Sequence, residues 1–273
     1  MLDPDRIASL ALKARALRRE VVTMVHRANS GHIGGSLSAT ELMVALHYEV
    51  MRHDPRKPAW PHRDRFLLSK GHCTPIYYSV LADCGYFPRE DLATFRRAGS
   101  HLQGHPYQPK TPGVDASTGT LGLGLSTACG MALAAKLRHA PHHIYVLCGD
   151  GEQQEGQIWE AAMFAHKYRL DHLIAFTDRN RLQTDGSTED VMPLDPLADK
   201  WSAFGWNSWE IDGHDFNQVI DAVARAKSLS GRPSMIIANT IKGRGVSFME
   251  NVASWHGTPP TDAEHARALD ELR

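Results

Sequence analysis

IYVLCGDGEQQEGQIWEAAMFAHKYRLDHLIAFTDRN, residues 144–180, gives the clearest indication of the fold. Short apolar runs at Ile144–Cys148 and Leu173–Thr177 are typical of buried strands, and Gln157–Tyr168 between them carries a helical pattern. Strand, helix and strand in this order form the repeating unit of a parallel sheet whose faces are covered by helices.

The same alternation continues outside this stretch. Toward the C-terminus the sequence predicts strands at Trp206–Ile211 and Met235–Asn239, and helices at Pro196–Phe204 and Phe216–Ser228. In the more helical N-terminal half it predicts a strand at Phe66–Leu68 and helices at Arg6–Ala28, Ser38–Met51 (with Ser38 or Thr40 as N-cap) and Leu125–Leu137. We therefore expect one domain over residues 1–273, a three-layer α/β/α fold with a mainly parallel sheet.

The composition excludes several classes of function. The 273 residues are 42% hydrophobic and 22% charged, which argues against disorder. A formal net charge of −1 gives no electrostatic footprint for nucleic acid or for an anionic membrane. With no run of about 18 apolar residues and no signal-peptide pattern, we expect a soluble, cytoplasmic protein. The cysteines form no CxxC pair, and Cys84 and Cys129 are expected to be buried, reduced thiols.

Asp150 and Asn180 stand just after the two strands of the central stretch. Because the carboxyl ends of neighbouring parallel strands meet at one edge of a sheet, we expect these side chains to lie side by side. Gly149 and Gly151 let a ligand approach the backbone, and Gly151 leads toward a helix N-terminus, which favours anions. A carboxylate and an amide oxygen are ligands of the magnesium type. GDG alone is a common turn, but with Asn180 the pattern predicts a site for a metal ion and phosphate.

A second glycine-rich stretch, residues 117–124 (STGTLGLG), precedes the predicted helix Leu125–Leu137. Two interpretations stay open: a flexible loop that caps the helix, or backbone wrapped around a flat or phosphorylated ligand. The stretch matches neither a Walker A loop nor the dinucleotide spacing G-x-G-x-x-G.

Histidine is unusually frequent, with 16 in the chain. Four of the histidines that adjoin glycine are singled out, because a neighbouring glycine indicates a tight turn: His32, His72, His105 and His256. A lone loop histidine is usually a surface residue, but four on glycine turns favour a polar pocket that holds phosphate and moves protons near neutral pH.

The remaining histidines give no zinc signature. The four-residue spacings His101/His105 and His139/His143 are interrupted by glycine or proline, and HExxH is absent. The basic turn that holds His139, His142 and His143 is expected to be solvated surface.

Seven motifs occur in order and at appropriate spacing, and together they resemble transketolase, a thiamine-diphosphate enzyme. They are SGH (30–32), DRFLLSKGH (64–72), GHP (104–106), STGTLGLG (117–124), GDG…N (149–180), DGHD (212–215) and KGRGVSFMEN…WHG (242–257). The resemblance runs from about residue 10 to the end of the sequence. It implies the diphosphate-binding (PP) domain of that family, which has the thiamin-diphosphate-binding fold. The GDG…N pair alone would also admit 2-oxo-acid dehydrogenases, acetolactate-type decarboxylases and deoxyxylulose-phosphate synthase.

The resemblance implies roles for individual positions. Metal ligands would be Asp150, Asn180 and the backbone carbonyl of Leu182, holding Mg²⁺ (with Ca²⁺ or Mn²⁺ as substitutes). Contacts to thiamine diphosphate would come from Gly119, Thr120, Leu121, Gly151 and Asn180, with His72 and His256 near the diphosphate. Catalytic residues would be His32, His105 and His256, which face the sugar, and Glu155, which belongs to a network between cofactor sites across a dimer. The implied reaction transfers a two-carbon ketol unit (glycolaldehyde) from a ketose or ketose phosphate to an aldose or aldose phosphate.

The sequence departs from the common transketolase pattern at several positions. Ile33 and Thr120 stand where proline is frequent, Leu123 replaces a usual glutamine, and Arg179 stands before Asn180 where an acidic or amide residue is common. None of these changes removes a predicted ligand, but they put in doubt a substrate preference inferred from full-length relatives.

The length is the largest departure. In this family a pyrimidine-binding domain and a C-terminal domain follow, and 273 residues hold no candidate region for either. The resemblance therefore implies the N-terminal subunit of a split transketolase, whose partner in an α2β2 assembly is a C-terminal subunit. Pentose-phosphate sugars are the default substrates, and a specialised catabolic sugar is an alternative. Two other functions stay open: a subunit of another thiamine-diphosphate enzyme such as deoxyxylulose-phosphate synthase, and a non-catalytic cofactor-binding assembly subunit.

Overall fold

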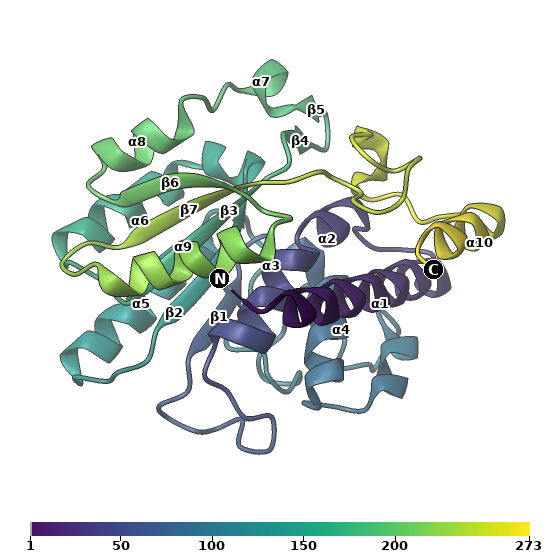
Figure 1. The fold of residues 1–273 in the computed structure, drawn as a ribbon, viewed down its shortest axis with the longest axis horizontal. Helices are drawn as coiled ribbons and strands as arrows, with labels where there is room; N and C mark the ends of the chain where they lie inside the picture. The colour runs from purple at the N-terminus through teal and green to yellow at the C-terminus, as the bar shows by residue number, and fades with distance from the viewer. Residues whose placement is uncertain (1) are drawn as a thin grey trace.

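The fold is built on one five-stranded parallel sheet with the strand order β1-β2-β3-β7-β6 (Figure 1). The structure is a computed structural model that describes residues 2–273. The strands of the sheet are β1 (Arg65–Leu68), β2 (Ile144–Gly149), β3 (Leu173–Arg179), β6 (Asn207–Asp212) and β7 (Ser234–Asn239). Two short strands, β4 (Leu182–Gln183) and β5 (Gly186–Ser187), form a separate antiparallel pair beyond β3.

Helices cover both faces of the sheet, which makes three layers. One face carries α1 (Pro4–Ala28), α2 (Gly34–Ser38), α3 (Thr40–Ala45), α4 (Thr74–Cys84), α9 (Phe216–Ser228) and α10 (Asp262–Glu271). The other face carries α5 (Leu123–Leu137), α6 (Gly156–Lys167) and α8 (Leu197–Ala203). The short α7 (Thr188–Val191) follows β5. A π-helical turn η1 (Leu46–Val50) and the 3₁₀ turns η2 (Gly71–Cys73), η3 (Arg89–Thr94), η4 (Gly151–Gln154) and η5 (Ala253–His256) complete the elements.

The alternation of strand side chains explains why both faces are covered. Along β2, Tyr145 and Leu147 pack into the core under α1, α3 and α9, whereas Ile144 and Val146 pack into the core under α5 and α6. All four are fully buried. A strand that buries both faces reads as a continuous apolar run rather than an alternating one, as IYVLC does. The predicted α/β/α fold is therefore confirmed.

The predicted strands are confirmed to within one or two residues. The most polar of them, Trp206–Ile211, becomes β6 at an edge of the sheet, where Asn207 and Trp209 remain half-exposed. An edge strand has one neighbour rather than two, so it keeps some contact with water, and this explains its weaker apolar pattern.

The prediction of one helix over Ser38–Met51 is wrong in its start and its continuity. The glycine- and serine-rich residues before it already form α2, and the region ends in the π-helical turn η1. Neither predicted N-cap acts as one. The Ser38 hydroxyl donates to Asp178 Oδ2 at 2.6 Å, and the Thr40 hydroxyl donates to the Ser36 carbonyl at 3.1 Å. The Ser38 hydroxyl is therefore used by a distant buried carboxylate, and the Thr40 hydroxyl by a backbone carbonyl of the preceding turn.

The basic turn that holds His139, His142 and His143 was expected to be solvated surface. His143 is not a fully solvated side chain, because its ring stacks on that of His172 with centroids 4.6 Å apart. Burial lowers the pKa of His143 to about 4.

Among residues 2–273 the four cysteines are free thiols; Cys129 is buried as expected, whereas Cys84 is half-buried. In the same part of the chain, none of the helices combines the length and the apolar character that spanning a membrane requires.

Candidate functional site

A cavity of about 370 Å³ opens at the carboxyl edge of the sheet, where open α/β sheets bind ligands. Residues that directly follow β1, β2 and β3 line it, and so does the loop after β7. Most of the residues singled out from the sequence lie in its wall: His32, His72, His105, Gly119, Leu121, Asp150, Gly151, Glu155, Asn180, Leu182 and His256. Segments that are far apart in the chain therefore meet at one place.

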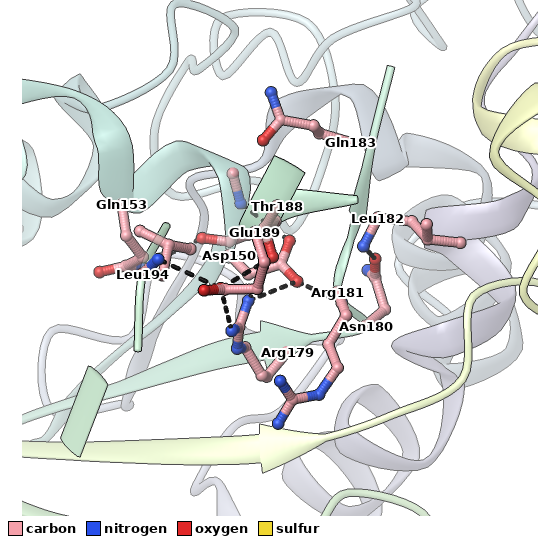
Figure 2. Close-up of polar contacts among 12 residues, drawn as sticks. Asp150, Gln153, Arg179, Asn180, Arg181, Leu182, Gln183, Thr188, Glu189 and Leu194 are labelled. Atoms are coloured by element: carbon pink, nitrogen blue, oxygen red, sulfur yellow. Dashed lines mark hydrogen bonds and ion pairs between the residues drawn. The ribbon is translucent and has the colours of Figure 1, made fainter. Parts of the chain in front are cut away.

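Asp150, Asn180 and Leu182 line this cavity and carry three kinds of oxygen between them. Figure 2 shows how these residues lie relative to Arg179. Asp150 is 3% exposed and accepts hydrogen bonds from the backbone N–H groups of Gly151 and Arg181. Asn180 Oδ1 accepts from the Leu182 N–H at 3.1 Å, which fixes the amide orientation. A carboxylate, an amide oxygen and a backbone carbonyl are hard donors of the kind that Mg²⁺ prefers.

Lys242 competes for one of these oxygens. Its Nζ donates to the Leu182 carbonyl at 2.9 Å and lies 2.8 Å from His256 Nδ1. Burial, together with the nearby charge of Lys70, lowers the pKa of Lys242 to about 8. A metal ion at the Leu182 carbonyl would therefore require this ammonium to move to another acceptor, and a phosphate group in the cavity is a suitable one.

Among residues 2–273, no group of three or more His, Cys, Asp or Glu side chains is arranged to hold a metal ion. The oxygen set described above contains a single such side chain, Asp150. Burial raises the pKa of Asp150 to about 6, and the neighbouring Asp178 carboxylate acts in the same direction. A cation bound at this carboxylate would remove that destabilisation of its charged form.

His32, His72 and His256 form a compact cluster in the cavity wall. Their ring centroids are separated by 5.0 Å (His32 to His72), 5.3 Å (His32 to His256) and 5.2 Å (His72 to His256). Burial is the main cause that lowers the pKa of His32 to about 4 and that of His256 to about 3. The pKa values of His72 and His105 are lowered for the same reason. All four imidazoles are therefore neutral near pH 7 and can accept a proton or a hydrogen bond.

The positive charges in the cavity come from two lysines, Lys70 and Lys242, which stand in the motifs SKGH and KGRG but were not among the residues predicted from the sequence. Lys70 is 1% exposed, and its Nζ pairs with the fully buried Asp178. Burial alone would lower the pKa of Lys70, but the Asp178 carboxylate holds it above its ordinary value. The same pairing lowers the pKa of Asp178. Lys70 is therefore a fixed cation whose charge Asp178 balances, and Lys242 adds a second ammonium group. Both can contact an anionic group, and the carboxylates of Asp150, Glu152, Glu155 and Asp185 line the same cavity.

The glycine-rich loop is held by a buried carboxylate that the sequence analysis also missed. Glu152 accepts from the Ser69 hydroxyl, from the Gly122 N–H at 2.9 Å and from the Gly149 N–H at 3.0 Å. Gly122 has φ +87°, and a Cβ there would lie 2.9 Å from Glu155 Cβ. This glycine is required both for its backbone conformation and for the close approach of Glu155.

Two predicted residues occupy less central positions. Thr120 lines a neighbouring hollow with Ser117 and Leu123 rather than the main cavity. Glu155 lines the main cavity at the start of α6, but its side chain is exposed. An exposed carboxylate at the rim is placed to interact with whatever covers the cavity.

A parallel sheet whose carboxyl edge opens into a cavity lined by oxygen donors, neutral imidazoles and two lysines defines the chain as an α/β protein with a ligand site at that edge. The family profile described as "Transketolase, thiamine diphosphate binding domain" matches residues 10–272. The chain therefore belongs to the transketolase family through its thiamine-diphosphate-binding domain.

Three relatives illustrate the match. The chain is 49% identical over 260 residues to the 6-deoxy-6-sulfo-D-fructose transketolase subunit SqwG of Clostridium sp. (strain MSTE9), with 95% of this chain and 94% of the relative covered. It is 43% identical over 267 residues to an apulose-4-phosphate transketolase subunit of Phocaeicola vulgatus, with 98% and 95% covered. The crystal structure of transketolase from Campylobacter jejuni superposes with a TM-score of 0.91 at 33% identity, covering 97% of this chain and 43% of that one.

These relatives differ in length. The chain spans nearly the whole of the relatives that are named as subunits, but about two fifths of the longer transketolase. The prediction of an N-terminal transketolase subunit is confirmed at this level, and thiamine diphosphate is the cofactor of the matched domain.

Proposed function

We propose that this chain is the N-terminal subunit of a split transketolase that transfers a two-carbon ketol unit from a ketose or its phosphate to an aldose or its phosphate. The observation that carries the proposal is the convergence of the four glycine-flanked histidines on the cavity that also holds Asp150 and Asn180. A binding module for a diphosphate needs cations and a metal, whereas neutral imidazoles beside them provide groups for proton transfer.

The residues present fit thiamine diphosphate and Mg²⁺. Asp150, Asn180 and the Leu182 carbonyl would hold the metal, and Lys70 and Lys242 offset the charge of a diphosphate. Within the described part of the chain, the buried Nδ1 of His32 has no hydrogen-bond partner, which leaves it available to a bound molecule. When bound, thiamine diphosphate supplies a carbanion for breaking and forming carbon–carbon bonds.

The chain's own residues would bind the sugar and manage protons. His32, His105 and His256 would face the sugar, and because their pKa values are lowered they would start as acceptors of a hydroxyl proton. Each can return that proton as the reaction proceeds. The narrow glycine turns that carry them fix the positions of the rings relative to the oxygen set.

Exposed apolar side chains at the rim of the cavity are an argument for a partner subunit. Leu121 and Leu123 are 37% and 48% exposed beside the cavity, and Met192, whose carbonyl accepts from Gln154, is 58% exposed. Exposed apolar side chains around a ligand site favour coverage by another protein. We propose that a C-terminal transketolase subunit with pyrimidine-binding and C-terminal domains covers this rim, that Glu155 takes part in the contact, and that the assembly is α2β2.

The substrate is proposed to be a specialised sugar rather than a general pentose phosphate. Two relatives named as subunits carry the names of sulfofructose and apulose 4-phosphate, and they match this chain over nearly its full length.

The proposal is tested by titrating thiamine diphosphate and Mg²⁺ into the assembled complex and by measuring ketol transfer. Asp150→Ala is expected to abolish Mg²⁺-dependent cofactor binding, and unchanged binding would refute the site. His32→Ala is expected to keep cofactor binding but to lose most of the turnover. If His32→Ala retained full turnover, the chain would be a non-catalytic assembly subunit instead.

A further inference from the structure

Arg179 is a departure from the transketolase pattern, and it lies between the candidate metal ligand Asp150 and the segment 183–195. It is the last residue of β3, and its side chain is 1% exposed. Figure 2 shows its guanidinium beside Asp150 and Glu189. Buried guanidinium groups are rare unless all their partners are in place, because an unpaired buried charge is strongly unfavourable. The partners of Arg179 therefore show what it holds.

The guanidinium reaches in two directions. Toward the cavity, Nη1 lies 3.7 Å from Asp150 Oδ2. Toward the segment, Nη1 donates to the Thr188 hydroxyl at 2.7 Å, and Nη2 donates to Glu189 Oε1 at 2.8 Å and to Asp195 Oδ1 at 3.1 Å. One side chain thus joins the candidate metal carboxylate to three residues of the following loop.

The segment 183–195 forms part of the cavity wall. Gln183, Thr184 and Asp185 line the cavity, and Gln154 Nε2 donates to Gln183 Oε1 and to the Met192 carbonyl, both at 2.9 Å. A change in the position of this segment would therefore alter the space in which a ligand of Asp150 sits.

Arg179 is buried whereas its carboxylate partners are partly exposed, so the loss of these contacts is most unfavourable for Arg179. The Glu189 and Asp195 side chains are 38% and 50% exposed, so water can solvate either carboxylate if the contact is lost. The buried guanidinium has no such alternative, and it therefore favours the arrangement in which its contacts with Thr188, Glu189 and Asp195 are kept. Each ion pair alone is weak, and the shared buried cation makes them act together.

We propose that Arg179 is a positioning residue that ties the segment 183–195 to Asp150, so that the wall of the cavity and the metal-binding carboxylate hold their places together. The proposal rests on the proposed function to the extent that Asp150 binds the metal. It assigns Arg179 no contact with substrate or cofactor.

The first test is hydrogen exchange of the full-length chain, which does not require the cofactor. Arg179→Met keeps an unbranched, largely apolar stem and removes the charged guanidinium group. We expect amide exchange in residues 183–195 to rise by about ten-fold, the effect of losing one charge-assisted hydrogen bond, while exchange in β7 and α9 stays unchanged. Arg179→Lys should give an intermediate rise, because one ammonium cannot reach all the partners at once.

The second test measures the Mg²⁺ concentration at which binding of thiamine diphosphate to the assembled complex reaches half of its maximum. We expect Arg179→Met to raise it about ten-fold, as loss of an outer partner of a metal ligand does. Asp150→Asn is the reference variant, because it removes the ligand itself. If Asp150→Asn shifts the Mg²⁺ requirement but Arg179→Met changes neither exchange nor Mg²⁺, the Arg179 proposal is wrong and the proposed function stands. If Asp150→Asn has no effect, the proposed function loses its metal site.

A third variant keeps the proposal testable if Arg179→Met does not fold. The double variant Glu189→Gln/Asp195→Asn alters two partly exposed side chains, so the fold should tolerate it. It is expected to raise exchange in residues 183–195 while exchange in β7 and α9 stays unchanged, and to lower the melting temperature, because the buried guanidinium loses its two carboxylate partners. Unchanged exchange in a folded double variant would overturn the proposal.

Discussion

The ion pair of Lys70 and Asp178 beneath the cavity gives the sharpest stability prediction. Lys70 Nζ pairs with Asp178 Oδ2, and the two side chains are 1% and 0% exposed. Asp178 also accepts from the hydroxyls of Ser38 and Thr240 and from Asn180 Nδ2. Breaking a buried pair by removing one partner costs about 3–5 kcal/mol, because an uncompensated charge remains buried.

Lys70→Met leaves the Asp178 carboxylate with its three other donors, so we expect the free energy of unfolding to fall by about 3 kcal/mol, at the low end of that range. Asp178→Asn leaves the Lys70 ammonium with the Gly35 carbonyl at 3.0 Å, and we expect a loss of about 4 kcal/mol. The double variant removes both charges, so its loss should be smaller than the sum of the single losses by about 2–3 kcal/mol.

The assay is urea unfolding of the isolated chain followed by far-UV circular dichroism, with m-values compared among variants. Lys13→Met is a matched control, because Lys13 pairs with Asp83 at 2.7 Å but is 36% exposed, and we expect it to cost less than about 1 kcal/mol. If the two single losses added to within about 0.5 kcal/mol in the double variant, the account of a coupled buried pair would be refuted.

Three further predictions concern glycine, pH and metal. Gly122→Ala should destabilise the chain by about 1–3 kcal/mol in urea unfolding, because Gly122 has φ +87° and an added Cβ would meet Glu155. Gly130→Ala within α5 has open space around it and should stabilise the chain by about 0.5–1 kcal/mol. Equal effects of the two variants would contradict the geometry. The pKa of His32 is lowered from 6.5 to about 4 in the folded chain, so the unfolded chain binds the proton first as the pH falls. The free energy of unfolding should therefore fall as the pH drops from 6.5 toward 4, and it should fall less steeply in His32→Asn. Identical pH profiles would argue against a buried neutral imidazole. Removal of Mg²⁺ from the assembled complex by a chelator should release thiamine diphosphate, measured by calorimetry, and retention of full affinity would contradict a metal at Asp150 and Asn180.

The part of the site that could be predicted from sequence is the part that depends on strand neighbours. Asp150 and Asn180 follow β2 and β3, which are adjacent in the sheet, so their proximity follows from a strand–helix–strand unit alone. The glycine-flanked histidines were also predictable as turn residues, and the structure brings His32, His72 and His256 together from distant loops.

The rest depends on contacts that no local pattern encodes. The helix α2 consists largely of glycine and serine, which are poor helix formers, and it is stable because tertiary packing buries it completely. The donation from Lys242 to the Leu182 carbonyl joins loops 60 positions apart. Arg179 stood out only as a departure from a family pattern, and its contacts with Glu189 and Asp195 became visible only in three dimensions.

The central claim is that this chain provides the diphosphate- and metal-binding half of a transketolase and needs a second subunit for turnover. The most direct measurement is ketol transfer from a panel of ketoses, with and without phosphate or sulfonate ends, by the purified chain in the presence of thiamine diphosphate and Mg²⁺. We predict no turnover by the chain alone and turnover after addition of a subunit that carries the pyrimidine-binding and C-terminal domains. Robust turnover by the chain alone would contradict the account.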